Sequence, residues 1–364
     1  MRRIPAMTIA LLLAGGAIAA EPARLNDVQA VGTHNSYKRP MPPDELAAHR
    51  ARDPRHADSL DYGHRPIAEQ LDHGMRAIEL DVYDDPQGGR WLHPPGAWRK
   101  GYATPPWSAA DAQAMARPGL KVMHLADIDF RSSCVTFVAC LTIVREWSDA
   151  HPRHAPILIT INAKDSGLGP GSPQPLPFDA AALDRIDAEI RSVLTGGKLI
   201  TPDEVQGNHA TLREAVRANA WPTLDASRGR VFVALDEPPE KVAAYRGKRR
   251  SLEGRAMFVA SEESSPFGAF LILNDPIADA PRIARAVADG YVVRTRADAD
   301  TREARRNDSA RRDAAFASGA QYVSTDYYEP DARWSDYRVA LPGGGAARCN
   351  PRRTAHCDGT AIEP

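Results

Sequence analysis

The chain has 364 residues, and its 46 Lys and Arg residues against 47 Asp and Glu residues give a formal net charge of -1 at pH 7. This balance argues against a nucleic-acid-binding surface, which usually carries a basic excess. A chain of this length can bury a large core, either as one α/β barrel or as two ordinary domains.

The N-terminus is typical of a secretory signal peptide. Arg2 and Arg3 precede an apolar run at residues 9–13, and small residues follow up to Ala20. A membrane anchor is the alternative, but the apolar run is shorter than the roughly 20 residues that span a bilayer. We expect residues 1–20 to be removed, and the mature protein to be secreted or periplasmic.

Short apolar, β-branched runs alternate with helical stretches along the rest of the chain. Strands are predicted at residues 28–33, 76–82, 121–124, 157–161, 230–235, 257–260, 291–294 and 321–324. Helices are predicted at residues 67–73, 137–150, 180–194, 240–245, 281–288 and 301–318. This pattern predicts an α/β fold, a regular or distorted (β/α)8 TIM barrel over residues 21–342. A doubly wound sheet would require a glycine-rich phosphate loop, which the sequence lacks.

The long connections at residues 83–119 and 166–178 follow predicted strands directly, which places them on the C-terminal rim of a barrel. Residues 343–364 form a separate tail. Four cysteines in an exported chain indicate two disulfides, with Cys134–Cys140 and Cys349–Cys357 the most economical of three pairings. Free thiols and metal ligands are the alternatives, although neither pair has CxxC spacing.

Polar residues at two strand ends predict a cation site. His34 and Asn35 end the first strand, and Glu79 and Asp81 lie on one face of the second because their spacing is i, i+2. Two close carboxylates repel each other unless a cation or a proton lies between them. A hard cation such as Ca2+ fits these oxygens, and Asn35 adds an amide oxygen.

A second histidine, His124, ends the third predicted strand. One histidine can accept a proton while the other donates one, as a phosphodiester displacement requires. For each histidine alone, a hydrogen-bonded packing role is the alternative. His93, in the long connection after Asp81, competes with His124 for the second role.

These segments resemble the bacterial calcium-dependent phosphatidylinositol-specific phospholipases C. The resemblance lies at residues 32–37 (GTHNSY), 67–83, 121–141 and 293–305. It implies that His34 stabilises the pentacoordinate phosphorus, that His124 acts on the leaving-group side, and that Asn35, Glu79 and Asp81 bind calcium. It also implies attack by the inositol 2-hydroxyl, with release of diacylglycerol and a cyclic inositol phosphate.

The chain departs from the family pattern at the end of the fourth strand. A glutamate ligand is expected there, but the sequence has Asn162. Asn162 can coordinate a metal through its carbonyl oxygen, yet it brings no charge and cannot act as a base. Calcium affinity should therefore fall, unless Asp127 or Asp129 substitutes as a ligand.

Three further residues are predicted to contact substrate. Lys164 shares a strand face with Asn162 and can meet the phosphate, or it is a solvated rim lysine. Arg296 is preferred over Arg294 as a phosphate ligand, the alternative being an ion pair with an aspartate. Tyr328 follows the last strand and can stack on the inositol ring, although an exposed loop tyrosine is the commoner case.

We expect a secreted, calcium-dependent phosphodiesterase of the phospholipase C type that acts as a monomer on a phospholipid. Two alternatives use the same pocket: a glycerophosphodiester phosphodiesterase, and a binding barrel without turnover. The partners are a phospholipid or another phosphodiester, with transient contact at a membrane surface and no nucleic acid. The arginine-rich stretch at residues 302–312 is interleaved with acidic residues, which is typical of a solvated helix face.

Overall fold

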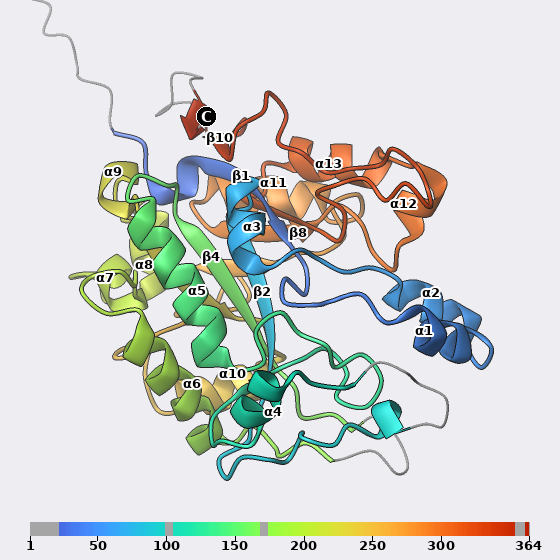
Figure 1. The fold of residues 1–364 in the computed structure, drawn as a ribbon. Helices are drawn as coiled ribbons and strands as arrows, with labels where there is room; N and C mark the ends of the chain where they lie inside the picture. The colour runs from blue at the N-terminus through green and yellow to red at the C-terminus, as the bar shows by residue number, and fades with distance from the viewer. Residues whose placement is uncertain (1–21, 99–104, 168–173, 354–360, 364) are drawn as a thin grey trace, which may run out of the picture.

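The computed structural model describes residues 22–98, 105–167, 174–353 and 361–363, and these residues form an α/β barrel (Figure 1). Among them, the parallel strands follow the order β6-β5-β4-β2-β1-β9-β8-β7. A parallel bridge between Ala260 and Phe270 brings β6 and β7 together, so the barrel is nearly closed and the predicted fold class is confirmed. The barrel strands are β1 (Val28–Thr33), β2 (Ala77–Tyr83), β4 (Ile157–Ala163), β5 (Val231–Leu235), β6 (Phe258–Val259), β7 (Phe270–Ile272), β8 (Val292–Arg296) and β9 (Tyr322–Thr325).

Helices lie on the outside of the barrel, and Figure 1 shows α3, α5 and α6 along the side formed by β2 and β4. Each buries an apolar stripe; in α5, for example, Phe137, Leu141 and Val144 face the core. None of the helices in the described ranges is long and apolar enough to cross a membrane. The α-helices are α1 (Pro43–Arg50), α2 (Pro54–Leu60), α3 (Ile67–Asp72), α4 (Ala109–Met115), α5 (Phe137–Ala150), α6 (Ala180–Val193), α7 (Pro202–Gln206), α8 (Leu212–Arg217), α9 (Leu224–Ser227), α10 (Pro239–Arg246), α11 (Ala280–Ala288), α12 (Arg302–Arg306) and α13 (Ala310–Ser318). The 3-10 helices are η1 (Leu25–Asp27) and η2 (Pro95–Trp98).

The third predicted barrel strand is wrong. Residues 121–124 supply only β3 (Lys121–Val122), which runs antiparallel to the end of β2 and stays outside the barrel path. Strand β7 completes the barrel instead. It has three residues, too few to show the alternation of apolar and polar side chains that predicts a strand.

The predicted helix at residues 301–318 is also wrong in part, because it is broken into α12 and α13. Asn307 adopts a left-handed backbone, with φ of 53°, and ends α12. Asparagine tolerates this conformation better than most residues, so it stops a helix that the apolar spacing alone would continue.

The C-terminal residues pack at the end of the barrel opposite the strand ends that carry the predicted site (Figure 1). Strand β10 (Ala347–Cys349) runs antiparallel to β1 and pairs with β11 (Ala361–Glu363). Ala30 is bonded to β9 on one side and β10 on the other, so β10 occupies the edge of β1 that faces β2. Strand β2 itself meets β1 only at the pair Gly32 and Ala77.

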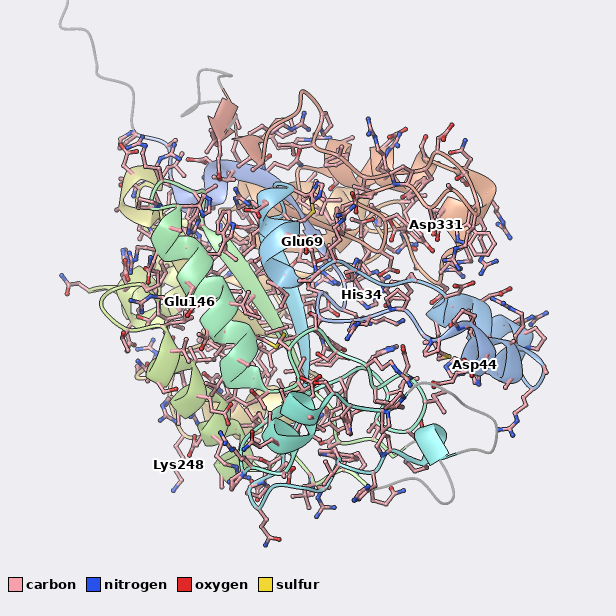
Figure 2. All side chains as sticks on the ribbon, viewed as in Figure 1. His34, Asp44, Glu69, Glu146, Lys248 and Asp331 are labelled. Carbon is pink, nitrogen blue, oxygen red and sulfur yellow. A yellow bond between two sulfur atoms is a disulfide. The ribbon has the colours of Figure 1, made fainter. Side chains whose placement is uncertain are left out.

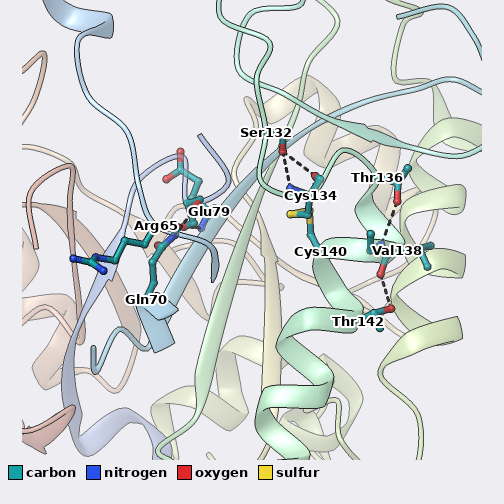
Figure 3. The surroundings of a disulfide bond; sticks show 11 residues. Arg65, Gln70, Glu79, Ser132, Cys134, Thr136, Val138, Cys140 and Thr142 are labelled. Carbon is teal, nitrogen blue, oxygen red and sulfur yellow. Dashed lines mark hydrogen bonds between the residues drawn. A yellow bond between two sulfur atoms is a disulfide. The ribbon is translucent and has the colours of Figure 1, made fainter. Parts of the chain in front are cut away.

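A disulfide joins Cys134 to Cys140 at the start of α5, with a Cα–Cα distance of 5.2 Å (Figure 3). This is the first of the two predicted pairings. The second involves Cys357, which lies outside the described residues, as does the predicted signal peptide at residues 1–20.

Candidate active site

A tight turn after β1 holds His34 beside β2. Asn35 has a positive φ of 49°, and the turn places Ser36 against Glu79. The backbone N–H of Ser36 donates to the Glu79 carbonyl at 3.0 Å, and the Glu79 N–H donates to Ser36 Oγ at 2.8 Å. Gln70, drawn near Glu79 in Figure 3, donates from Nε2 to the Ser36 carbonyl at 2.6 Å. These bonds fix the first-strand turn to the second strand.

His34 is oriented by a buried carboxylate. Its Nδ1 lies 2.8 Å from Asp326 Oδ1, and its Nε2 lies 3.4 Å from both Glu79 Oε1 and Arg296 Nη1. The His34 side chain is 19% exposed. Figure 2 labels it near the centre of the view, with Asp331 above it and Asp44 below it. Burial, and then the charge of Arg296, hold the pKa of His34 well below 6.5. Both effects favour the neutral form of His34.

His124 has the same arrangement on the other side of the site. Its Nδ1 lies 2.8 Å from Asp129 Oδ2, and Lys38 Nζ lies 3.3 Å from the other oxygen of Asp129. Tyr83 Oη donates to the His124 carbonyl at 2.9 Å, which fixes the backbone. The side chain is 18% exposed and lines a cavity of about 360 Å³ together with Lys164.

The two histidines thus form a pair of histidine–carboxylate units at one end of the barrel. They are close enough for the charge of His124 to contribute to the lowered pKa of His34. The competing candidate, His93, is exposed and lies just before η2. This placement favours His124 for the second role.

Each carboxylate of the β2 pair has a cationic partner. Glu79 forms a short ion pair with Arg294, and both side chains are buried. Asp81 Oδ2 lies 2.8 Å from Nζ of Lys164, the residue that directly follows β4. Asn162 lies directly opposite Asp81 in the register of β2 and β4, so Lys164 approaches from two residues later in the chain.

Residues 23–351 match a family described as phosphoinositide phospholipase C, Ca2+-dependent. The chain belongs to this family. It is therefore a phosphodiesterase of the phospholipase C class. No curated protein sequence matches the chain.

The fold of this phospholipase C is similar to that of two solved bacterial enzymes. A calcium-dependent phosphoinositol-specific phospholipase C from Pseudomonas sp. has a TM-score of 0.52 at 17% identity, over 87% of this chain and 95% of its own. A Ca2+-dependent phosphatidylinositol-specific phospholipase C from Streptomyces antibioticus has a TM-score of 0.54 at 20% identity, over 84% of this chain and 95% of its own. Similarity at these identities shows a shared fold.

The predicted calcium ligands of this phospholipase C are Asn35, Glu79, Asp81 and Asn162, and their oxygens are of the type that calcium prefers. Within the described ranges, the Asp81 carboxylate oxygens are buried and make no hydrogen bond, which favours a nearby cation. Lys164 supplies that cation at ion-pair distance, although not in hydrogen-bond geometry.

The other predicted ligands are also engaged. Arg294 pairs with Glu79, while the Asn35 side chain donates to Tyr62 Oη at 2.8 Å and accepts from Tyr37 Oη at 3.3 Å. In the described part of the chain, no group of three or more His, Cys, Asp or Glu side chains is arranged to hold a metal ion. As folded, this set of donors does not fit a calcium ion.

The predicted substrate ligands of the phospholipase C fall in different places. Lys164 lines the cavity beside His124, and its side chain is 33% exposed. Arg296 lies against His34 and pairs with Asp326 at 3.0 Å, the alternative considered for it. Tyr328 lines a separate cavity of about 420 Å³ with His64, and its ring packs against the His64 ring.

Three further residues belong to the site. Tyr62 and the contact of Asp326 with His34 are absent from the sequence prediction, whereas Asp236, after the fifth predicted strand, is expected from the sequence to orient substrate or to cap the following segment. Asp326 orients His34 and directly follows β9, so the strand-end rule that identified Glu79 could have found it. Asp236 directly follows β5, and burial raises its pKa to about 7. Tyr62, whose hydroxyl lies 3.2 Å from His34 Nδ1, is in a connection between α2 and α3 and has no sequence signal.

Proposed function

We propose that this phospholipase C cleaves a phosphatidylinositol-like lipid through attack of the inositol 2-hydroxyl on phosphorus. The products are diacylglycerol and a cyclic inositol phosphate. The supporting observation is the pair of histidine–carboxylate units, His34 with Asp326 and His124 with Asp129, at one end of the barrel. Residues 1–20 are proposed as a signal peptide, residues 21–342 as the barrel and residues 343–364 as a tail, in a secreted or periplasmic enzyme.

The two histidines divide the proton transfers between them. Neutral His34 accepts the proton of the inositol 2-hydroxyl at Nε2, because Asp326 occupies Nδ1. The hydroxyl oxygen bonds to phosphorus as the bond from phosphorus to the glycerol oxygen breaks. His124 donates a proton from Nε2 to that glycerol oxygen, and diacylglycerol leaves. Solvent then restores both histidines to their starting protonation states.

Fixed positive charge supports the phosphorus as negative charge grows on its oxygens. Lys164 reaches the cavity beside His124, and Arg296 lies beside His34. Preorganised cations in a partly buried site stabilise such charge more than they would in water. These side chains can bind the phosphate in the ground state and support it in the transition state.

Inositol as the head group has support from the family and from one structural neighbour. The Pseudomonas enzyme forms a complex with myo-inositol. In barrels of this fold, the active site lies at the C-terminal ends of the strands, where a polyol ring and a phosphate can bind together.

The function is tested by incubating the purified chain with phosphatidylinositol in detergent micelles and following the products by phosphorus NMR. We expect a cyclic inositol phosphate from wild type. His34→Ala and His124→Ala should each lower kcat by about 100-fold or more, because each removes one proton transfer. His93→Ala is the matched control and should retain wild-type kcat.

The products separate the alternatives. Glycerol 3-phosphate released from glycerophosphodiesters, without cleavage of phosphatidylinositol, would indicate a glycerophosphodiester phosphodiesterase. No product from any phosphodiester, from a chain with a cooperative thermal transition, would indicate a binding barrel without turnover.

A further inference from the structure

The β2 carboxylates are already neutralised by side chains of the chain itself. Glu79 and Asp81 carry two negative charges, and Arg294 and Lys164 carry two positive charges, so the four groups sum to zero. Glu79, Asp81 and Arg294 are 6%, 1% and 4% exposed, so these three groups lie where uncompensated charge is costly, while Lys164 is 33% exposed. A calcium ion added to these four groups would leave an excess charge of about +2. The neighbouring buried carboxyl group of Asp236 offsets it only in part, because burial raises its pKa to about 7.

The strand that faces the pair explains how the balance arises. Asn162 occupies the position opposite Asp81 and brings no charge. Two residues later, the Lys164 backbone N–H donates to the Val82 carbonyl at 2.8 Å, which fixes the start of the lysine side chain beside β2. The end of β4 and the residue that follows it therefore contribute a cation, and no anion, to the site.

Lys164 is also placed to act on substrate. Its ammonium lies 2.8 Å from Asp81 Oδ2 and borders the cavity that His124 lines. A lysine ammonium is a compact point charge on a flexible stem, so it can contact a carboxylate and a phosphate oxygen at once. Arg294, by contrast, is held by Glu79 and by Asn274 Oδ1 at 2.6 Å, and it is buried.

We propose that Lys164 occupies the place of the metal ion in this phospholipase C, so that cleavage of the phosphodiester proceeds without calcium. Its ammonium balances Asp81 and meets the substrate phosphate, while Arg294 balances Glu79. The inference rests on the proposed function, but it also makes a claim about calcium binding that does not depend on turnover.

Two measurements on the full mature chain test it. Phosphatidylinositol cleavage is measured in excess EGTA and in millimolar calcium, and calcium binding is measured by isothermal titration calorimetry without substrate. We expect equal rates in both conditions and no binding heat. Terbium luminescence is a second measurement of metal binding at the same site.

Two variants test whether a metal ion can replace the Lys164 ammonium. Lys164→Met should lower kcat in EGTA by about 100-fold, because the variant lacks the positive charge that contacts the substrate phosphate. Asn162→Glu combined with Lys164→Met should create a calcium site that is visible by calorimetry and should restore part of the rate when calcium is added. Lys198→Met, which removes a lysine paired with Asp149 on another face, is the matched control.

The possible results separate the two proposals. Loss of wild-type activity in EGTA, with recovery in calcium, would overturn the role of Lys164 while leaving the proposed function intact. Calcium binding by wild type would overturn it even if no activity is found. If no phosphodiester is cleaved in either condition, the proposed function fails, and a calcium site present only in the double variant would still support the placement of Lys164.

Discussion

At the scale of single residues, the buried carboxylates behind the histidines set their chemistry. Asp129 accepts from His124 on one oxygen and contacts Lys38 with the other. Burial raises the pKa of Asp129, but Lys38 and His124 outweigh it and lower the net value, so the carboxylate stays ionised. An ionised Asp129 favours the His124 tautomer that keeps a proton on Nδ1 and orients the ring toward the cavity.

Asp129 is therefore predicted to be a positioning residue. Asp129→Asn should lower kcat by about 100-fold with little change in KM, because the amide no longer stabilises the protonated His124. The measurement is kcat and KM for phosphatidylinositol as a function of pH. The side of the kcat profile that depends on the general acid should shift along the pH axis. Asp149→Asn, at an exposed carboxylate on α5, is the control. Equal losses in kcat and thermal stability for Asp129→Asn would assign it a structural role instead.

Residue types at strand ends could be predicted, but their partners could not. His34, Glu79 and Asp81 follow from the alternation of strands and the position of polar residues at their ends. The contact between Lys164 and Asp81 depends on the register of β2 with β4, which no local pattern encodes. Tyr62 reaches His34 from a connection whose path is set by tertiary packing.

At the scale of elements, the approach of β1 to β2 is unusually close. A Cβ added at Gly32 would lie 2.2 Å from Ala77 Cβ and 2.5 Å from the Ala77 carbonyl oxygen. The glycine thus lets the two strands that carry His34 and Glu79 meet. Because the obstacle includes backbone, side-chain rearrangement cannot relieve it.

Gly32→Ala should destabilise the fold by about 3 kcal/mol, at the upper end of overpacking effects, and should also lower activity by displacing His34 from Glu79. Gly89→Ala is a useful comparison, since the added methyl meets nothing within 4 Å and only its positive φ of 80° is strained. That variant should cost about 1 kcal/mol and leave activity unchanged. Chemical denaturation provides both values, and a smaller loss for Gly32→Ala than for Gly89→Ala would contradict the steric account.

Element types were more predictable than element membership. The helix at residues 137–150 has the predicted limits because Thr136 caps it, accepting from the Ala139 N–H at 3.3 Å, and its apolar stripe is regular. Strand β3 has strand-like residues but folds back antiparallel on β2. Whether a short apolar run enters a barrel depends on which edge is free, and that is a property of the assembled sheet.

At the scale of the whole molecule, a buried histidine couples stability to pH. His154 lies between α5 and β4, where its Nε2 contacts Ser148 Oγ at 2.6 Å and its Nδ1 contacts the Ala155 carbonyl at 2.6 Å. Burial lowers its pKa from 6.5 to about 4. The unfolded chain therefore binds a proton more readily than the folded chain between these two values.

The contribution of neutral His154 to stability is fully present above pH 6.5 and is lost as the pH falls toward about 4. The free energy of unfolding of wild type relative to His154→Gln should fall by roughly 3 kcal/mol over this window. Urea denaturation at a series of pH values measures the difference. His209→Gln, at an exposed histidine, should show no such change, and a pH-independent difference for His154→Gln would refute the assignment.

The pairing of β1 with β9 and β10 also sets the order in which the molecule can be assembled. The first strand to be synthesised finds both of these neighbours among the last segments to be made. Until they emerge, β1 keeps one whole edge open, and the other meets β2 only at Gly32. A nascent or truncated chain is therefore an incomplete barrel with an exposed strand edge, which is prone to pair with other chains. The barrel therefore closes late in folding, and His34 meets Asp326 only at that stage.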